Sequence, residues 1–310
     1  MEKILGLSFA PFVGKGRLNT DRAKDSLRKM QERTGANFVI FVPAAVQKTP
    51  QSEEIDFHSD RTVADEELID MIRYAKSLGL RAAVKPTVNC LNGTWRAHIS
   101  FFEEDVPCEP KWGNWFQSYT AFQLHFARLA QAEQADMFIA GCEMVQSEHR
   151  EAEWRKLIAD IREVYDGPVT YNTDKYQEHN VRWWDCLDLI CSSGYYPLHD
   201  WEHQLDRIEQ VVQRFEKPFF FAETGCMSVQ GSPQVPNDWT VRGPVDLEGQ
   251  AEWYEEMLSA CAKRSWVNGM CFWSWRANLY PEEAAAENGD YEVFAKPAEA
   301  VIRKYFSGRP

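Results

Sequence analysis

Two glutamates, Glu143 and Glu223, stand at the ends of short apolar runs, "DMFIAGCE" (136–143) and "KPFFFAETG" (217–225). Apolar runs of this kind favour the interior, whereas an ionised carboxylate needs water or a polar partner. Two carboxylates at the edge of a buried region can protonate a leaving oxygen and attack an anomeric carbon, which is the chemistry of glycoside hydrolysis. The sequence therefore indicates that these two side chains meet in one site.

Polar and aromatic side chains end several neighbouring apolar runs. Tyrosine, asparagine and lysine can hold sugar hydroxyls, and a tryptophan face can stack on a pyranose, although core packing is the commoner use of an aromatic ring. For Lys85 two roles stay open, binding of a hydroxyl and pairing with a carboxylate. We expect the following residues at the same site: Lys85, Tyr171, Asn172, Tyr195, Tyr196, Trp273 and Trp275.

The runs that carry these residues alternate with segments of helical periodicity. Most runs are continuously apolar, which is typical of parallel strands buried on both faces. The expected strands are 4–10, 36–43, 80–86, 136–143, 167–173, 187–197, 217–225 and 269–275. The expected helices are 21–35, 64–79, 115–135, 150–165, 201–216, 247–263 and 296–306.

Eight strands alternating with helices predict an α/β fold, namely a (β/α)8 TIM barrel that forms a single domain over residues 1–310. An open doubly wound sheet is the alternative, but it rarely needs eight evenly spaced units. Barrels place their sites at the carboxyl ends of the strands. Four long connections follow such ends: 44–63, 87–114, 224–246 and 276–295.

The period of two along a strand predicts which side chains share a face. Strict alternation puts Ile139, Gly141 and Glu143 on one side of their strand. It likewise groups Glu223 with Phe219 and Phe221 on the strand 217–225.

Composition excludes several kinds of partner. The net charge of −13 argues against nucleic acid, anionic membranes and anionic substrates. No apolar stretch reaches the roughly 18 residues of a membrane span. The segment "MEKILGLSFAPFV" lacks the length and cleavage site of a signal peptide, so we expect a cytoplasmic protein. The eight cysteines and seven histidines form no metal-binding spacing, and we expect no metal and no cofactor.

Five segments, taken together, resemble glycoside hydrolase family 113, whose members are β-1,4-mannanases and related mannosyl hydrolases of the large retaining clan A. The resemblance extends over nearly the whole chain, including the closing helix 296–306, and implies the same barrel. The segments are "KPTVNCLNGTWRAHI" (85–99), "FIAGCEM" (138–144), "SSGYYPL" (192–198), "FFFAETGCMS" (219–228) and "GMCFWSW" (269–275).

This resemblance implies a role for each matching residue. Glu143 matches the general acid/base and Glu223 the nucleophile. Tyr195 matches the tyrosine that hydrogen-bonds the nucleophile, with Tyr196 as the alternative. The residues that match substrate-side positions are Asn89, Trp95, Arg96, Trp273 and Trp275.

One position departs from the wider clan. Many members carry an asparagine just before the acid/base, where it binds the 2-hydroxyl of the sugar, and this chain has Cys142 there. Asn172 or Asn89 would then supply that contact. Specificity for mannose is therefore implied by the resemblance alone, and endo or exo action stays open.

The implied reaction is a double displacement that cleaves β-1,4-mannosidic linkages. Glu143 would need a raised pKa to hold its proton, and Glu223 would need donors such as Tyr195 to stay ionised. A retaining reaction requires carboxyl groups roughly 5–5.5 Å apart, whereas roughly 6.5–9.5 Å would indicate inversion.

Other functions stay open beside this one. A retaining β-glycosidase could act on gluco- or xylo-oligosaccharides instead. A non-catalytic carbohydrate-binding barrel would keep the tryptophans and lose a glutamate, yet both glutamates are present. A metal-dependent barrel hydrolase typically has a histidine on its first strand, and "ILGLSFA" has none.

Overall fold

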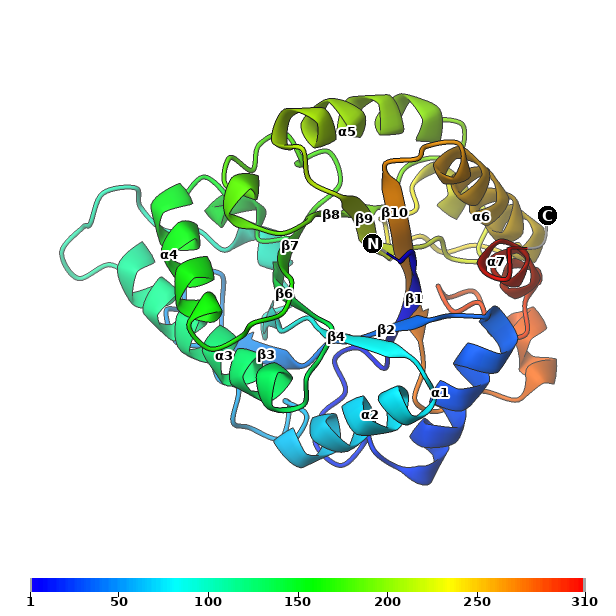
Figure 1. Ribbon diagram of the computed structural model, residues 1–310, viewed down its shortest axis with the longest axis horizontal. Coiled ribbons are helices and arrows are strands. Elements are labelled where there is room, and N and C mark those ends of the chain that lie inside the picture. The colour runs from blue at the N-terminus through cyan, green and yellow to red at the C-terminus, as the bar shows by residue number, and fades with distance from the viewer. Residues whose placement is uncertain (1, 309–310) are drawn as a thin grey trace.

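Eight of the apolar segments pair in parallel and close into a barrel (Figure 1). The computed structural model describes residues 2–308. Around the barrel the strand order is β1-β10-β9-β8-β7-β6-β4-β2. The fold is therefore the predicted (β/α)8 barrel and not an open sheet. Its strands are β1 (Ile4–Phe9), β2 (Phe38–Phe41), β4 (Arg81–Val84), β6 (Met137–Cys142), β7 (Val169–Thr173), β8 (Ile190–Gly194), β9 (Phe219–Thr224) and β10 (Val267–Trp275).

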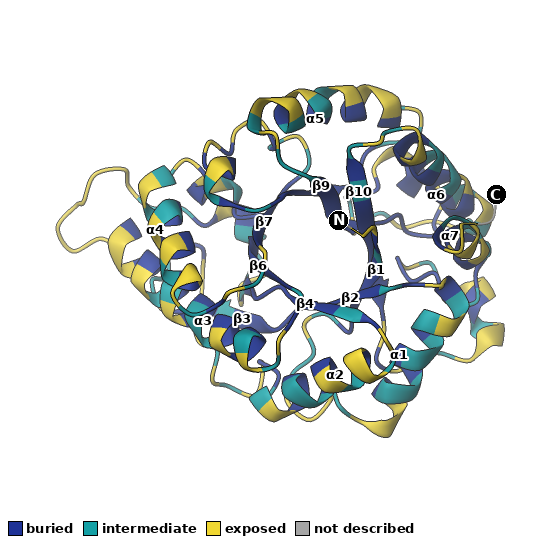
Figure 2. Cartoon of the chain, in the orientation of Figure 1, coloured by how far each residue is buried: buried dark blue, intermediate teal, exposed yellow. Residues whose placement is uncertain are grey.

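Helices surround the barrel and bury one face each against it (Figure 2). Local sequence signals set the ends of the first helix. Thr20 caps its amino end by accepting a hydrogen bond from the Ala23 N–H at 3.1 Å, and Gly35 ends it with φ of 76°. The helices are α1 (Asp21–Thr34), α2 (Asp65–Ser77), α3 (Trp112–Ala132), α4 (Glu151–Arg162), α5 (Trp201–Phe215), α6 (Leu247–Ala262) and α7 (Pro297–Phe306).

Two features of the connections differ from strict alternation. Between β7 and β8 the chain forms only a short 3-10 turn, Trp184–Cys186, in place of a helix. The long connections after β2 and β4 are not structureless, since β3 (Ala44–Gln47) and β5 (Thr87–Cys90) pair in parallel within them. The β5 strand directs the loop that carries Trp95 and Arg96.

Most of the buried hydrophobic residues belong to two clusters. One occupies the barrel interior and includes Ile40, Ile139 and Phe220. The larger one lies between strands and helices and contains most of the tryptophans, among them Trp154 and Trp201. Most aromatic residues of this chain are therefore core residues.

Two register shifts overturn the expected strand alternation. The pairing of β6 with β7 shifts between Ile139 and Cys142, and the pairing of β8 with β9 shifts beside Glu223. Ile139 lies inside the barrel, whereas a Cβ on Gly141 would point at Tyr119 of α3. The grouping of Ile139 with Gly141 was wrong, because a bulge adds one residue and reverses the sides beyond it.

The same correction applies to β9. Phe219 and Phe221 pack in the layer between strands and helices. Glu223 lines a cavity and contacts Lys85 instead. The bulge therefore turns the carboxylate toward the barrel axis.

Gly141 is the position in this strand that only glycine fits. Its φ is +101°, and a Cβ would lie 2.1 Å from Tyr119 Oη. We expect Gly141→Ala to lower the free energy of unfolding by about 2 kcal/mol or more, since steric overlap and backbone strain add. Urea unfolding followed by circular dichroism measures this change.

Gly113→Ala is the matched control. Gly113 lies in α3 with nothing within 4 Å of its Cβ position. Alanine there should raise stability by roughly 0.5–1 kcal/mol. Equal effects of the two alanines would contradict the steric role of Gly141.

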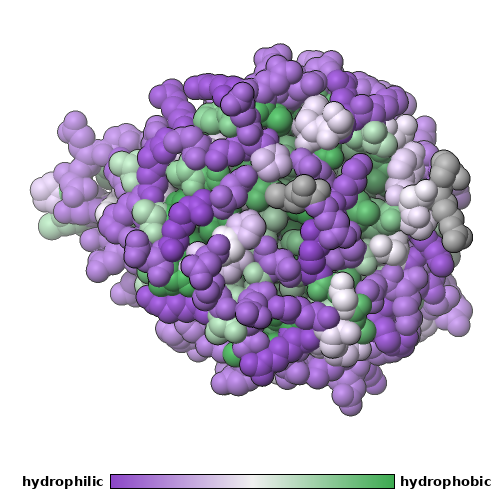
Figure 3. Space-filling model, in the orientation of Figure 1, coloured by the Kyte–Doolittle hydropathy of each residue, from purple (hydrophilic) through white to green (hydrophobic). Residues whose placement is uncertain are grey.

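The surface is mostly hydrophilic on the face shown in Figure 3. Across residues 2–308, no helix combines the length and the apolar character that crossing a membrane requires. All eight cysteines are free thiols.

Candidate active site

A cavity of about 740 Å³ opens at the carboxyl ends of the barrel strands. This volume lies within the range of small-molecule sites. Glu143 follows β6 and Glu223 lies near the end of β9, and both line the cavity while remaining largely buried. The other lining residues lie within β5 and β10 or in the connections that follow β1, β5, β7, β8, β9 and β10, and they include Phe12, Asn89, Trp95, Arg96, Asp174, Lys175, Tyr195, Trp239, Trp273 and Tyr291.

The carboxylate of Glu223 is held at both oxygens. Lys85 Nζ donates to Oε2 at 2.8 Å, and Tyr195 Oη donates to Oε1 at 2.8 Å. The thiol of Cys142 points at Oε2 from 3.6 Å. Two strong donors on opposite oxygens fix both the position and the rotation of the group.

These contacts decide the charge of Glu223. Burial opposes ionisation, but Lys85, followed by Arg96 and Tyr195, outweighs it and holds the pKa of Glu223 below its usual value. Burial likewise opposes the charge on Lys85, yet the acidic groups Cys142 and Glu223 raise the pKa of Lys85. Glu223 is thus a buried carboxylate that stays ionised.

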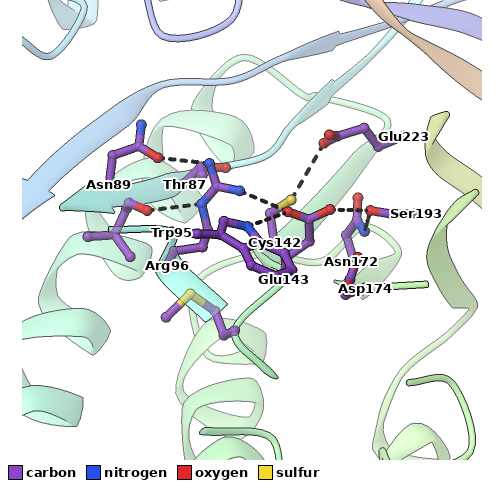
Figure 4. A network of polar contacts seen from close by, with 12 residues as sticks. Thr87, Asn89, Trp95, Arg96, Cys142, Glu143, Asn172, Asp174, Ser193 and Glu223 are labelled. Atoms are coloured by element: carbon purple, nitrogen blue, oxygen red, sulfur yellow. Dashed lines mark hydrogen bonds and ion pairs between the residues drawn. The ribbon is translucent and has the colours of Figure 1, made fainter. Parts of the chain in front are cut away.

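Glu143 has a different set of partners (Figure 4). Its Oε2 accepts hydrogen bonds from Trp95 Nε1 at 3.1 Å and Arg96 Nη1 at 3.0 Å. Its Oε1 accepts one from Ser193 Oγ at 2.8 Å. Arg96 is in turn held by Asn89 Oδ1, at 2.8 Å from Nη2. The loop after β5 therefore fixes one side of Glu143, and the end of β8 fixes the other.

Most of the expected site residues come together here. Asn89, Trp95, Arg96, Tyr195 and Trp273 line the cavity. Lys85 takes the second of its two possible roles, since it is fully buried and pairs with Glu223.

Asn172 is fully buried beneath the cavity and is already fully engaged. Its Oδ1 accepts from Lys85 at 3.3 Å, and its Nδ2 donates to Ser193 Oγ and to the Thr173 carbonyl, both at 2.9 Å. It supports neighbouring side chains and does not reach the cavity. This placement corrects its expected role in substrate binding.

Tyr196 and Trp275 also lie away from the cavity. Tyr196 is fully buried on the helix side, where its hydroxyl donates to Glu178 Oε1 at 2.5 Å. Trp275 is 1% exposed, and its Nε1 donates to Ser26 of α1. Both were expected to bind substrate. Tyr196 directly follows Tyr195, which takes the cavity side, so alternation explains its burial. Trp275 stands two residues beyond Trp273 and should share its side, but the pairing of β1 with β10 shifts register between Phe272 and Trp275, and this bulge reverses the side.

Several residues of the site were missed by the sequence reasoning. Asp174, Trp239 and Tyr291 line the cavity, whereas Ser193 is fully buried and belongs to the site through its hydrogen bond to Glu143. Ser193 and Asp174 lie at or just past strand ends, so the same rule that found Glu143 could have found them. Burial and then the charge of Glu143 raise the pKa of Asp174. Trp239 and Tyr291 come from long loops, and no local pattern marks them.

The arrangement lacks the ligand geometry of a metal site: no group of three or more His, Cys, Asp or Glu side chains in the described part of the chain could hold an ion. It does contain two carboxylates with unequal surroundings. One sits against an ammonium group, and the other is bound by an indole, a guanidinium and a hydroxyl. A site of this kind can assign separate roles to its two carboxylates.

Comparison with known proteins agrees with this geometry. The model of Glycoside Hydrolase Family 113 matches residues 7–296. A solved complex of a GH113 β-1,4-mannanase is 54% identical over 100% of both chains, with a TM-score of 0.98. The β-mannanase of Alicyclobacillus acidocaldarius in complex with ManMIm is 41% identical over 99% of this chain and 98% of that one, with a TM-score of 0.95.

More distant similarity concerns the fold alone. A β-glucuronidase of Ruminococcus gnavus is 14% identical, with a TM-score of 0.66 over 98% of this chain and 50% of its own. No curated protein sequence matches the chain.

Proposed function

We propose that this chain, which belongs to glycoside hydrolase family 113, hydrolyses β-1,4-mannosidic linkages in mannan or manno-oligosaccharides with retention of configuration. The observation that carries the proposal is the pair of unlike carboxylates, Glu143 and Glu223, in one cavity at the strand ends. The linkage follows from the β-1,4-mannanase similar to it over its whole length.

In the first step Glu223 attacks the anomeric carbon. Its lowered pKa keeps it ionised, and the Lys85 and Tyr195 contacts hold its oxygens in place. Glu143 donates its proton to the departing oxygen as the glycosidic bond breaks, which leaves a covalent glycosyl ester on Glu223. In the second step Glu143 takes a proton from water, the water oxygen attacks the anomeric carbon, and Glu223 is released.

The cavity walls offer both kinds of contact that a sugar needs. The aromatic rings of Trp273, Trp95 and Trp239 line it, and their faces suit the apolar face of a pyranose. For the 2-hydroxyl we propose Asn89, since Asn172 is buried and fully bonded.

Product analysis tests the proposal. Purified protein is incubated with β-1,4-linked manno-, gluco- and xylo-oligosaccharides, and NMR follows the anomer that forms first. We expect cleavage of the manno series with β-anomer released first. An initial α-anomer would mean inversion and would remove the nucleophile role of Glu223.

The remaining outcomes of the panel are equally decisive. Faster cleavage of the gluco or xylo series would replace mannose by another sugar. Binding of oligosaccharide without any cleavage would favour a non-catalytic barrel. The cytoplasmic location stays a prediction, which cell fractionation would check.

A further inference from the structure

The turn after β6 holds Glu143 in a backbone conformation that its own side chain disfavours. Glu143 has φ of 54°, in the left-handed region. Contacts from neighbouring elements must therefore maintain it. The Glu143 N–H donates to the Asn172 carbonyl at 2.8 Å, and the Met144 N–H donates to Tyr171 Oη at 2.8 Å.

The second of these contacts leads to a buried carboxyl group. Tyr171 Oη accepts from Met144 and donates to Glu148 Oε1 at 2.8 Å. The same oxygen accepts from Thr173 Oγ1 at 2.6 Å. Glu148 is the last residue of the turn 143–148, and its carboxyl group binds that end directly to Tyr171 and Thr173 of β7. The beginning of the turn is bound to β7 through the contact of Met144 with Tyr171.

The tyrosine itself has little freedom to move. It is fully buried, and its ring centroid lies 4.8 Å from that of Trp154 and 5.0 Å from that of Trp183. Trp183 also donates from Nε1 to the Glu148 carbonyl at 3.0 Å. The packing around Tyr171 and the hydrogen bond from Trp183 therefore fix the distance between Glu148 and Met144.

We propose that Glu148 is a positioning residue that acts through Tyr171 to hold the Glu143 carboxyl in place for proton transfer. Glu148 does not line the cavity and touches no substrate. The inference rests on the proposed acid/base role of Glu143.

The protonation state of Glu148 decides which substitution is conservative at this position. Burial, reinforced by the carboxylates of Asp174 and Glu178, raises the pKa of Glu148 to about 8, although Thr173 and Tyr171 oppose the shift. At neutral pH the group therefore carries a proton. Glutamine keeps the neutral charge and the acceptor that Tyr171 and Thr173 use, whereas leucine removes the acceptor.

The test compares kcat and KM of the variants on two substrates that differ in whether the leaving group must be protonated by a general acid. Mannotetraose requires proton donation to its leaving oxygen. The dinitrophenolate of 2,4-dinitrophenyl β-mannobioside departs without a proton, and added azide replaces the water that needs a base. A defect confined to Glu143 should therefore appear on the first substrate and vanish on the second.

We expect Tyr171→Phe and Glu148→Leu each to lower kcat on mannotetraose about 10- to 100-fold with KM nearly unchanged, because misplacement by about 1 Å costs rates of this order. On the activated substrate with azide the loss should be less than about threefold. Glu148→Gln should stay within about threefold of the parent on both. The double variant Tyr171→Phe/Glu148→Leu should match the single ones, because they remove one shared interaction.

Tyr165→Phe is the matched control. Tyr165 is also a buried tyrosine, donating to the Ala135 carbonyl at 2.7 Å, and it lies outside the cavity. Its loss should change stability and leave the ratio of the two activities unaltered. Equal losses on both substrates for Tyr171→Phe, or none, would overturn the inference. If either disruptive variant does not fold, loss of mannotetraose activity in a folded Glu148→Gln would overturn it, and full activity there would support it.

Glu143→Ala in the same assay separates this inference from the proposed function. If azide restores its rate on the activated substrate and yields β-mannobiosyl azide, the acid/base role stands. If azide does not restore the rate, Glu143 is not the acid/base, and the proposed function is contradicted whatever the role of Glu148.

Discussion

Glu223→Gln is expected to lower kcat on manno-oligosaccharides by roughly 10⁴-fold or more, because the amide cannot form the glycosyl ester. The fold should survive, since the amide oxygen can still accept a hydrogen bond from Lys85 or Tyr195. Steady-state release of reducing sugar, together with circular dichroism, measures both expectations.

The stereochemistry of the azide product shows which of the two carboxylates a variant has lost. In Glu223→Ala an azide ion can enter where the carboxylate stood and attack the activated mannobioside from that face, giving the α-azide. Glu163→Gln, an exposed carboxylate at the end of α4, is the control and should keep full activity. Formation of β-azide by Glu223→Ala, or retained hydrolysis by Glu223→Gln, would contradict the nucleophile assignment.

Lys85→Met should have the next largest effect, because it leaves Glu223 buried without its cation. Breaking a buried ion pair on one side costs about 3–5 kcal/mol of stability at neutral pH. The pair consists of a fully buried Nζ at 2.8 Å from Oε2. Urea unfolding at several pH values measures the loss, and pH profiles of kcat/KM measure the consequence for catalysis.

The sign of the pH effect follows from the lowered pKa of Glu223. A depressed pKa in the folded state adds stability above the unfolded value of about 4.3, and this contribution is lost as pH falls through the folded value. Lys85 has a raised pKa and stays charged throughout the acidic range. Without Lys85 the pKa of Glu223 rises, so the acidic limb of kcat/KM should move to higher pH.

The same reasoning predicts that the stability difference between Lys85→Met and the parent shrinks as the solution becomes acidic, where Glu223 is protonated in the variant. Lys156→Met serves as a control, since Lys156 pairs with Asp160 on the exposed face of α4 and such pairs contribute little. An unmoved acidic limb in Lys85→Met would show that Lys85 does not set the charge of Glu223.

The sequence by itself determined the architecture and the two carboxylates. Continuous apolar runs mark buried parallel strands, and their number and alternation with helices leave few folds besides a barrel. A glutamate at the end of such a run is a local signal, because parallel strands in a closed barrel deliver their carboxyl ends to one face. Glu143 and Glu223 could be assigned to one site for this reason, before any contact was known.

Only the tertiary structure decided which side chains turn toward the cavity. The bulges beside Cys142 and Glu223 reverse the strand faces, and their positions depend on pairing between strands far apart in sequence. Tyr195 and Tyr196 are chemically alike, yet burial against helices takes one of them out of the site. Likewise, the partnership of Lys85 with Glu223, and of Glu148 with the turn that carries Glu143, joins residues whose contact no local pattern encodes.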